Sequence, residues 1–245
     1  KADGLVFVSS VFRDRAVQVH GHIAPTIITP NAANIAQFTF TQAQRDEARQ
    51  HWGLEGHVVC GYLGAFVPWH AIDQFVYRIA EALKANPHLK LLLVGDGAKF
   101  DEVKQFVLDK DLSSQIVMVG RVPHDRVPGL LAAMDMAILP SAGDYTSPVK
   151  LFEFMACGVP PIAPDFAPIR EVLKPDVTGW MFPAGQLDEA VAQVIARSQD
   201  KAALASVGQS ARGYIAEHRQ WRNNIVQLTD FLVSLTDKRR GAPSR

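Results

Sequence analysis

Short apolar runs alternate along most of the chain with segments that have helical spacing of apolar residues. Residues 91–94 read Leu-Leu-Leu-Val and residues 116–119 read Ile-Val-Met-Val. Nearly continuous apolar runs of this length are typical of strands whose two faces are both covered. Because strands and helices alternate with short connections, the pattern predicts a parallel, doubly wound α/β sheet of the Rossmann-like type, with extra helices at the C-terminus.

The pattern predicts eight strands and ten helices. The strands are Leu5–Ser9, Thr26–Thr29, His57–Gly64, Leu89–Val94, Ile116–Val119, Ala137–Leu139, Pro161–Ala163 and Thr178–Phe182. The helices are Val11–His20, 41–51, Ala71–Lys84, Phe100–Leu108, Arg126–Met134, Pro148–Ala156, Pro168–Leu173, Leu187–Ser198, Lys201–Glu217 and Trp221–Thr236. Ligands of such sheets bind beyond the carboxyl ends of the strands, so the loops after residues 64, 95, 120 and 140 are the informative ones.

The chain is expected to divide into three parts. Residues 1–35 form a β-α-β piece without a partner sheet, which we interpret as the end of a preceding domain. Residues 36–215 form the sheet domain, and residues 216–245 form a last helix and a basic tail. A solvated or disordered terminus is the favoured interpretation of the tail from Lys238 onward, and contact with a membrane surface is the alternative.

Composition excludes some classes of function. With 25 basic and 25 acidic residues the formal charge is zero, which argues against a nucleic-acid partner. Cys60 and Cys157 lie in apolar surroundings without metal-ligand spacing, which indicates a reducing compartment. Neither a long apolar stretch nor a signal-peptide pattern is visible. These features predict a cytoplasmic protein, and the inner face of a membrane remains an open location.

The segment from Ser147 carries the strongest chemical signal. Ser147 is expected to cap a helix whose first residue is Pro148, since proline lacks an N–H where the helix has no acceptor for one. The backbone amides of Val149, Lys150 and Leu151 would then be free donors at the positive end of the helix. Such a helix start is an anion site, and the Lys150 side chain can reach the same anion.

An acid lies deeper in the same helix. Glu153 interrupts the apolar run of residues 151–155, and a buried carboxylate is costly without a hydrogen-bond donor. It lies about 9 Å along the helix axis from the anion site. A phosphate at the helix start and a hydroxylated sugar beside Glu153 would satisfy both groups, so the segment predicts a nucleotide-sugar pocket.

Other loops add weaker signals. Gly64 allows close approach of the backbone to a ligand, and His70 either donates to a phosphate or has a structural role beside Trp69. Gly95 begins a Gly-Asp-Gly turn that breaks the dinucleotide fingerprint at the next expected glycine. The backbone of Arg121 and Val122 can read the edge of a base, while the Arg121 side chain pairs with a phosphate or with a surface acid.

With these loops in order, the chain resembles the donor-binding half of a retaining GT-B glycosyltransferase of glycosyltransferase family 4 (glycosyl transferases group 1). The resemblance extends almost from end to end. The motifs that carry it are Ile28-x-Pro30-Asn31, Leu93-Val94-Gly95-Asp96-Gly97, Val119-Gly120-Arg121-Val122, Ala133-x-Asp135-x-Ala137-x-Leu139-Pro140-Ser141, Ser147-Pro148-x-Lys150-Leu151-Phe152-Glu153-x-Met155-Ala156-x-Gly158-x-Pro160, Ile169-x-Glu171 and Thr178-Gly179.

The resemblance implies a reaction and a set of roles. A sugar would pass from a nucleotide-diphosphate donor to an acceptor hydroxyl with retention, without a metal or another cofactor. Glu153 would be the second acid of the family's E-x7-E motif and hold the ribose hydroxyls, and the helix amides would receive the diphosphate. The Arg121–Val122 backbone would meet the base. A glycan or a lipid-linked acceptor would bind through a preceding domain, to which the last helix crosses back.

Three departures from the family's pattern concern the site. Tyr145 stands where the first acid of E-x7-E is expected, with Asp144 beside it. The usual basic pair of the first loop falls on Ala65 and His70, and the glycine that follows is Ala71. Stabilisation of the leaving group would therefore depend on Lys150, His70 and the helix dipole.

Three alternatives remain open at this point. A non-catalytic module with a degenerate donor site is the first, and an NAD-dependent oxidoreductase on a similar sheet is the second. A GT-B phosphorylase or a sugar-nucleotide epimerase is the third. The donor base, its sugar and the acceptor are not predicted.

Overall fold

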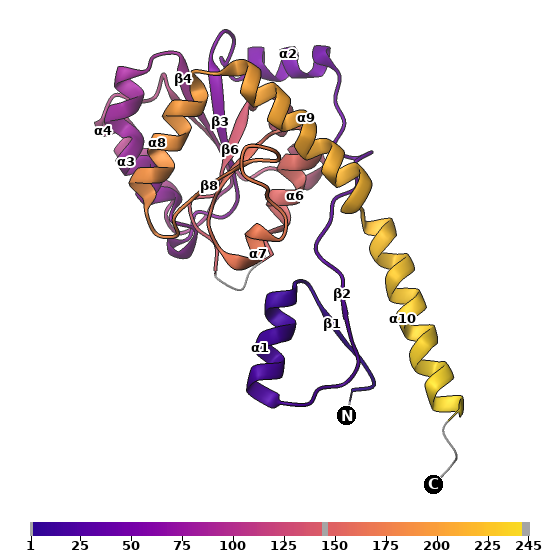
Figure 1. Ribbon diagram of the computed structural model, residues 1–245. Coiled ribbons are helices and arrows are strands. Elements are labelled where there is room, and N and C mark those ends of the chain that lie inside the picture. Colours follow the sequence, from indigo (N-terminus) through magenta and orange to yellow (C-terminus); the bar gives the residue numbers. More distant parts are fainter. Residues whose placement is uncertain (1, 144–146, 242–245) are drawn as a thin grey trace.

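The computed structural model describes the backbone of residues 2–143 and 147–241, and its main body is a parallel six-stranded sheet (Figure 1). The strand order is β5-β4-β3-β6-β7-β8. The strands are β3 (Val58–Leu63), β4 (Leu89–Val94), β5 (Ile116–Gly120), β6 (Met136–Ile138), β7 (Pro161–Pro164) and β8 (Trp180–Phe182). The direction of strand addition reverses between β3 and β6, which is the point where a doubly wound sheet opens a ligand crevice.

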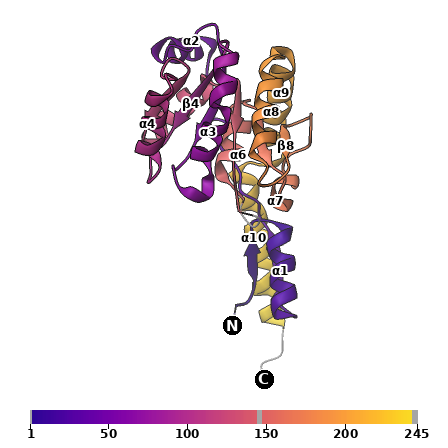
Figure 2. The same ribbon diagram turned by 90° about the vertical axis from the view of Figure 1, so that its left-hand side faces the viewer.

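Helices cover both faces of the sheet (Figure 2). The elements that follow one another around it are α2 (Gln42–His51), η1 (Pro68–His70), α3 (Ile72–Ala85), α4 (Phe100–Asp109), η2 (His124–Arg126), α5 (Val127–Ala132), α6 (Val149–Ala156), α7 (Ala167–Arg170), α8 (Leu187–Ser198) and α9 (Lys201–His218). The doubly wound fold predicted from the alternating pattern is confirmed.

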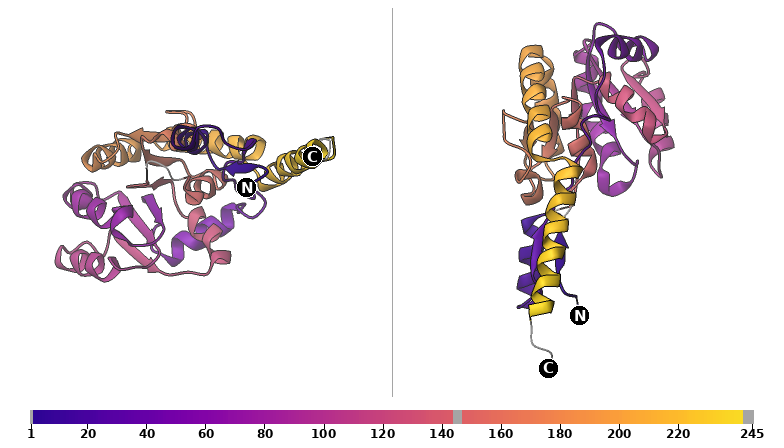
Figure 3. Two further views of the ribbon diagram at one scale, coloured as in Figure 1. Left: turned by 90° about the horizontal axis from the view of Figure 1, so that it is seen from below. Right: turned by 90° about the vertical axis from the view of Figure 1, so that its right-hand side faces the viewer.

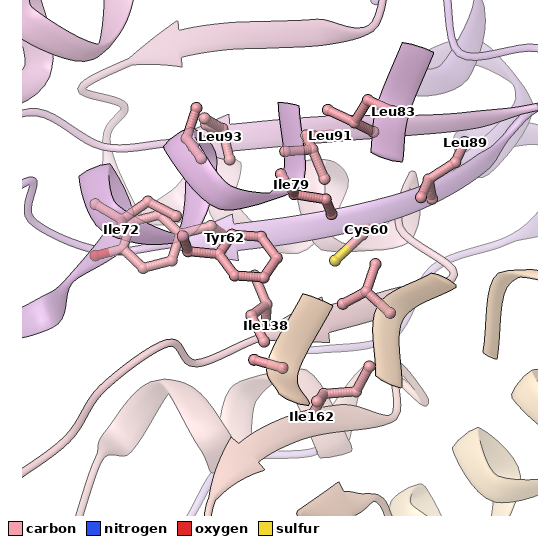
Figure 4. Packing of buried hydrophobic residues seen from close by; sticks show 14 of the residues in the cluster. Cys60, Tyr62, Ile72, Ile79, Leu83, Leu89, Leu91, Leu93, Ile138 and Ile162 are labelled. Atoms are coloured by element: carbon pink, nitrogen blue, oxygen red, sulfur yellow. The ribbon is translucent and has the colours of Figure 1, made fainter. Parts of the chain in front are cut away.

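Two apolar clusters pack on the opposite faces of the sheet. Cys60 and Leu91 belong to the cluster that α3, α4 and α8 cover. Figure 4 shows both from close by, with Ile79 of α3 among their neighbours. Their neighbours Val59 and Leu92 face α2, α5, α6 and α9. Alternate residues of one strand point to opposite faces, so both must be apolar when helices cover both. This explains why the strands read as continuous apolar runs.

A smaller unit lies apart from the main sheet. The strands β1 (Leu5–Phe7) and β2 (Thr26–Ile28) pair in parallel, and α1 (Ser10–His20) connects them. The last helix, α10 (Trp221–Gly241), extends from the sheet domain alongside this unit (Figures 1 and 3). Asn224 Nδ2 donates to the Pro30 carbonyl oxygen at 2.6 Å, and a Cβ atom added at Gly4 would lie 2.6 Å from Leu235 Cδ1. The predicted β-α-β piece is therefore present and packs against α10.

The start of α1 is held by an acid of the sheet domain. Ser9 caps α1 with its own side chain, and the Ser10 amide donates to Glu171 Oε1 at 3.1 Å. The Ser10 hydroxyl also donates to Glu171. A carboxylate at a helix N-terminus satisfies free N–H groups and complements the helix dipole. Glu171 directly follows α7, so this contact joins the small unit to the sheet domain.

The predicted bounds of α6 and α10 are wrong. Helix α6 begins at Val149 rather than Pro148, and the capping position belongs to Pro148 instead of Ser147. Pro148 has an extended ψ of 116°, and the Ser147 carbonyl accepts from Asn31 Nδ2 at 2.6 Å. At the C-terminus, α10 extends to Gly241, so part of the expected basic tail is helical.

Candidate functional site

Three of the four predicted loops, those after β3, β4 and β5, meet at the carboxyl edge of the sheet around a cavity of about 240 Å³. The predicted residues His70, Lys150 and Glu153 do not belong to the lining of this cavity. Its wall comes from the ends of β3, β4 and β5 and from the loops that follow them. The lining residues are Leu63, Gly64, Ala65, Val94, Gly95, Asp96, Arg121, Val122, His124 and Val127. Five of the predicted donor-binding residues, Gly64, Ala65, Gly95, Arg121 and Val122, are thus brought together.

Two glycines allow the cavity wall to form. A Cβ atom at Gly95 would lie 1.9 Å from the Gly64 carbonyl oxygen, and the φ of Gly95 is +131°. A Cβ atom at Gly64 would lie 2.4 Å from Lys150 Nζ. The glycines were predicted for close approach to a ligand. In the structure they also permit the loops after β3 and β4 to pack directly against each other.

Lys150 reaches the loop after β3 from the first turn of α6. Its ammonium is buried, lies 5.4 Å from the centre of the Tyr62 ring, and has no hydrogen-bond partner among the described residues. Burial lowers the pKa of Lys150 to about 8, an effect that the nearby Glu153 carboxylate opposes. A buried ammonium without an acceptor is unfavourable. The site therefore holds a cation that an anion would stabilise.

His70 has a structural contact as well as a place at the site. Its Nδ1 lies 2.9 Å from the Ala65 carbonyl oxygen, which also accepts from Tyr62 Oη at 2.8 Å. A carbonyl oxygen only accepts, so Nδ1 carries the proton and the neutral ring has a free lone pair on Nε2. Burial, and then the charge of Lys150, lower the pKa of His70. Neutral His70 is therefore an acceptor at Nε2, and it donates there only when protonated.

Glu153 is buried within α6, as predicted, and its partner was missed by the sequence analysis. His124 Nε2 lies 3.2 Å from Glu153 Oε1. His124 belongs to η2, which follows β5, and it lines the cavity. The pair joins residues 29 positions apart. The only signal in the sequence was the place of His124 in an informative loop.

The start of α6 offers fewer free amides than predicted. The Leu151 amide donates to the Pro148 carbonyl oxygen at 3.0 Å, so its prediction as a free donor is wrong. The amides of Val149 and Lys150 have no hydrogen-bond acceptor among residues 2–143 and 147–241. The predicted residues Asp144 and Tyr145 lie outside the described residues.

A larger cavity of about 510 Å³ lies between α2 and the η2–α5 segment. It contains none of the predicted site residues, and it lies beside helices rather than at the strand ends. Ligands of doubly wound sheets bind where the strand order reverses. We therefore assign the site to the smaller cavity.

The described part of the chain has neither a metal-binding cluster nor a helix that could span a membrane. In that part, no cluster of three or more histidine, cysteine, aspartate or glutamate side chains is arranged to hold a metal ion. Among the described helices, none combines the length and the apolar character that crossing a membrane requires.

Comparison with known proteins identifies relatives. The family model for glycosyl transferases group 1 matches residues 57–201. The N-acetyl-alpha-D-glucosaminyl L-malate synthase of Bacillus anthracis is 34% identical over 153 residues, which are 62% of this chain and 39% of that protein. A GDP-mannose-dependent monoacylated alpha-(1-6)-phosphatidylinositol monomannoside mannosyltransferase of Corynebacterium glutamicum is 23% identical over 96% of this chain and 63% of its own length. The chain thus spans only part of these relatives.

Solved structures share the fold. Anabaena HepE in complex with UDP superposes with a TM-score of 0.85 at 20% identity, covering 95% of this chain and 64% of that chain. The C-terminal domain of the glycosyl transferase group 1 family protein LpcC of Francisella tularensis has a TM-score of 0.68 at 17% identity. The match covers all of that domain and 78% of this chain.

These matches agree with the resemblance seen in the sequence. None of the relatives named here is an oxidoreductase, so the NAD-dependent alternative receives no support. The family model covers more than half of the 245 residues. The chain therefore belongs to the family of glycosyl transferases group 1.

Proposed function

We propose that this chain is the donor-binding half of a retaining glycosyltransferase that moves a sugar from a nucleotide-diphosphate donor to an acceptor hydroxyl. A preceding domain would bind the acceptor, a glycan or a lipid-linked sugar. UDP in the complex of Anabaena HepE and the C-terminal origin of the LpcC domain support this division of roles. We expect the protein to act in the cytoplasm, either free or at the inner face of a membrane.

The buried ammonium of Lys150, which has no partner among the described residues, is the observation that carries the proposal. It lies against Gly64, which lines the cavity, and the amides of Val149 and Lys150, also without an acceptor in the described part of the chain, begin the same helix. A diphosphate at this point would neutralise the ammonium and accept from the amides. As the bond to the sugar breaks, the same groups would stabilise the charge that develops on the leaving diphosphate. The proposal assigns this role to the chain's own groups, without a metal or cofactor.

The other site residues have complementary roles in the proposal. Glu153 would accept from the ribose hydroxyls, and the backbone of Arg121 and Val122 would contact the base. His70 would take up a proton when the diphosphate binds, because the anion stabilises the imidazolium form. Its Nε2–H would then donate to a diphosphate oxygen, since Nδ1 is engaged by Ala65.

Calorimetric titration with UDP, GDP and ADP tests the proposal. At least one is expected to bind, and Lys150→Met is expected to weaken that binding by at least about tenfold, as expected for loss of a charged hydrogen bond. Lys104→Met on the exposed face of α4 is the matched control, since Lys104 makes no contact with the site. A folded protein that binds none of the three would contradict the proposal.

A measurement of glycosyltransferase activity distinguishes the proposed enzyme from the non-catalytic alternative. In a complete protein, His70→Lys together with Tyr145→Glu would restore the residues that the family's pattern places at these positions. Glycosyltransferase activity of the complete protein without these two substitutions supports the proposal. A protein that binds nucleotide and becomes active only after them would instead be a degenerate module.

A further inference from the structure

His124 contacts the acid of the site but belongs to none of the motifs that suggested it. It lies in η2, the short turn that directly follows the loop after β5. Its Nε2 is 3.2 Å from Glu153 Oε1, and its ring packs edge-on to Phe38 with centroids 6.5 Å apart. Phe38 is itself buried. The imidazole thus contacts an apolar ring and the carboxylate, while much of its surface stays exposed.

The two oxygens of the Glu153 carboxylate have different surroundings. Oε1 accepts from His124, because a carboxylate oxygen only accepts and the ring nitrogen must donate. Oε2 has no hydrogen-bond partner among the described residues, and it does not belong to the buried atoms without a partner. No described residue therefore occupies Oε2. A carboxylate held at one oxygen presents the other in a fixed direction.

His124 lines the cavity and Glu153 does not, so His124 connects the carboxylate to the cavity wall. We propose that His124 is a positioning residue for nucleoside recognition, which holds Oε1 of Glu153 so that Oε2 accepts from the pentose hydroxyls. The inference rests on the proposed function, since it needs a nucleotide in the cavity. In this inference His124, which follows β5, supports the contact between the pentose and Glu153 of α6.

Substitution of His124 by alanine is expected to leave the fold intact. The His124 side chain is 64% exposed, and ion pairs at exposed positions contribute little to stability. His124→Gln is the conservative variant, because its side-chain amide retains an N–H donor. Asp125→Ala is the matched control, since Asp125 lies in the same turn and makes no contact with Glu153.

The experiment compares UDP with its 2′-deoxy and 3′-deoxy analogues by calorimetric titration, and it does the same for GDP and ADP. The native chain is expected to prefer the ribonucleotide. His124→Ala is expected to reduce this preference about tenfold, as expected for a charged hydrogen bond that is no longer oriented. His124→Gln should restore part of it, and Asp125→Ala should retain all of it.

The outcomes distinguish failure of the proposed function from failure of the inference about His124. If no nucleoside diphosphate binds to the native chain, the proposed function fails and the inference fails with it. If nucleotides bind but His124→Ala keeps the full preference for ribose, only the role of His124 is overturned. A loss of affinity equal for ribose and deoxyribose forms would also overturn it, because that loss would show a general effect on the cavity.

Discussion

The charge of Lys150 determines how the site responds to pH. Burial lowers the pKa of this ammonium to about 8, and a bound diphosphate would raise it again. Binding is then coupled to proton uptake when the free amine is partly neutral. Tyr62, His70 and Glu153 are the other titratable groups around it, and the lowered pKa of His70 adds proton uptake in the same direction.

We therefore expect the affinity for UDP, or for whichever diphosphate binds, to fall as the pH rises through about 8. Above that value the loss approaches about tenfold per pH unit, because only the ammonium form binds well. The second ionisation of a phosphate lies near pH 6, so the nucleotide does not change charge in this range. Titrations from about pH 7 upward, in buffers of different ionisation enthalpy, measure both the affinity and the proton uptake. Lys150→Met should remove the fall near pH 8 and leave only the smaller dependence that His70 contributes at lower pH, and a flat profile in the native chain would contradict the expectation.

Ala71 is a second residue with a measurable consequence. It has φ of 52° and ψ of 25°, a left-handed conformation that disfavours a residue with a Cβ atom. The family's pattern has glycine at the position of Ala71. Ala71→Gly should therefore raise the free energy of unfolding by about 0.5 to 1 kcal/mol. Denaturant unfolding measures this change.

Ala82→Gly, in the interior of α3, is the control for Ala71→Gly. It should lower the free energy of unfolding by about 1 kcal/mol, because glycine disfavours a helix interior. If both substitutions destabilise the protein, the backbone at Ala71 is not strained.

At the scale of elements, one carboxylate ties α2 to the sheet. Asp135 Oδ2 accepts from the Val59 amide at 2.8 Å and from Arg49 at 3.1 Å, while Oδ1 accepts from Arg45. Both arginines belong to α2, and Val59 belongs to β3. The acid thus holds the helix beside the start of β6.

Asp135→Ala is expected to lower the free energy of unfolding by about 2 to 3 kcal/mol, because two partly buried guanidinium groups lose their anionic partner and the Val59 amide loses its acceptor. Asp135→Asn should lower the free energy of unfolding by less, since the amide oxygen of asparagine remains as an acceptor. Asp109→Ala, at the exposed end of α4, should change stability by no more than about 0.5 kcal/mol. Thermal or denaturant unfolding distinguishes these values, and equal effects of the two alanine variants would contradict this role of Asp135.

How well an element was predicted depended on local signals. The bounds of β4 and α8 were predicted without error, because a strongly periodic or apolar run there ends at clear breakers. The start of α6 was misplaced because Pro148 fits both the capping position and the first turn, and only its extended ψ places it before the helix. The predicted helix 126–134 is shorter, with a 3₁₀ turn before α5.

The part of the site that was predicted is the part formed by strand ends, because strand ends converge in a doubly wound sheet. Gly64, Gly95 and Arg121 follow three strands that lie side by side, so topology alone brings them to one cavity. The contact between His124 and Glu153 needs the side-chain directions of two elements from different loops. No spacing in the sequence contains that information.

At the scale of the whole molecule, the sheet domain contains almost all of the core. Apart from Ala33, the two apolar clusters consist of residues between 38 and 215. A fragment of residues 36–219 is therefore expected to unfold cooperatively and to retain nucleotide binding within about threefold, since the cavity and α6 lie inside it. Circular dichroism and titration with UDP, GDP and ADP measure both properties. A fragment without a cooperative transition would show that the small unit and α10 are needed for folding.

The contact of Glu171 with the start of α1 has a mechanical consequence. Any rotation of the β1–α1–β2 unit against the sheet domain must withdraw this carboxylate from the Ser10 amide and hydroxyl. A helix start that loses its acid loses about 1 kcal/mol of favourable interaction. The contact therefore opposes such a rotation only weakly, by an energy that thermal fluctuations can overcome.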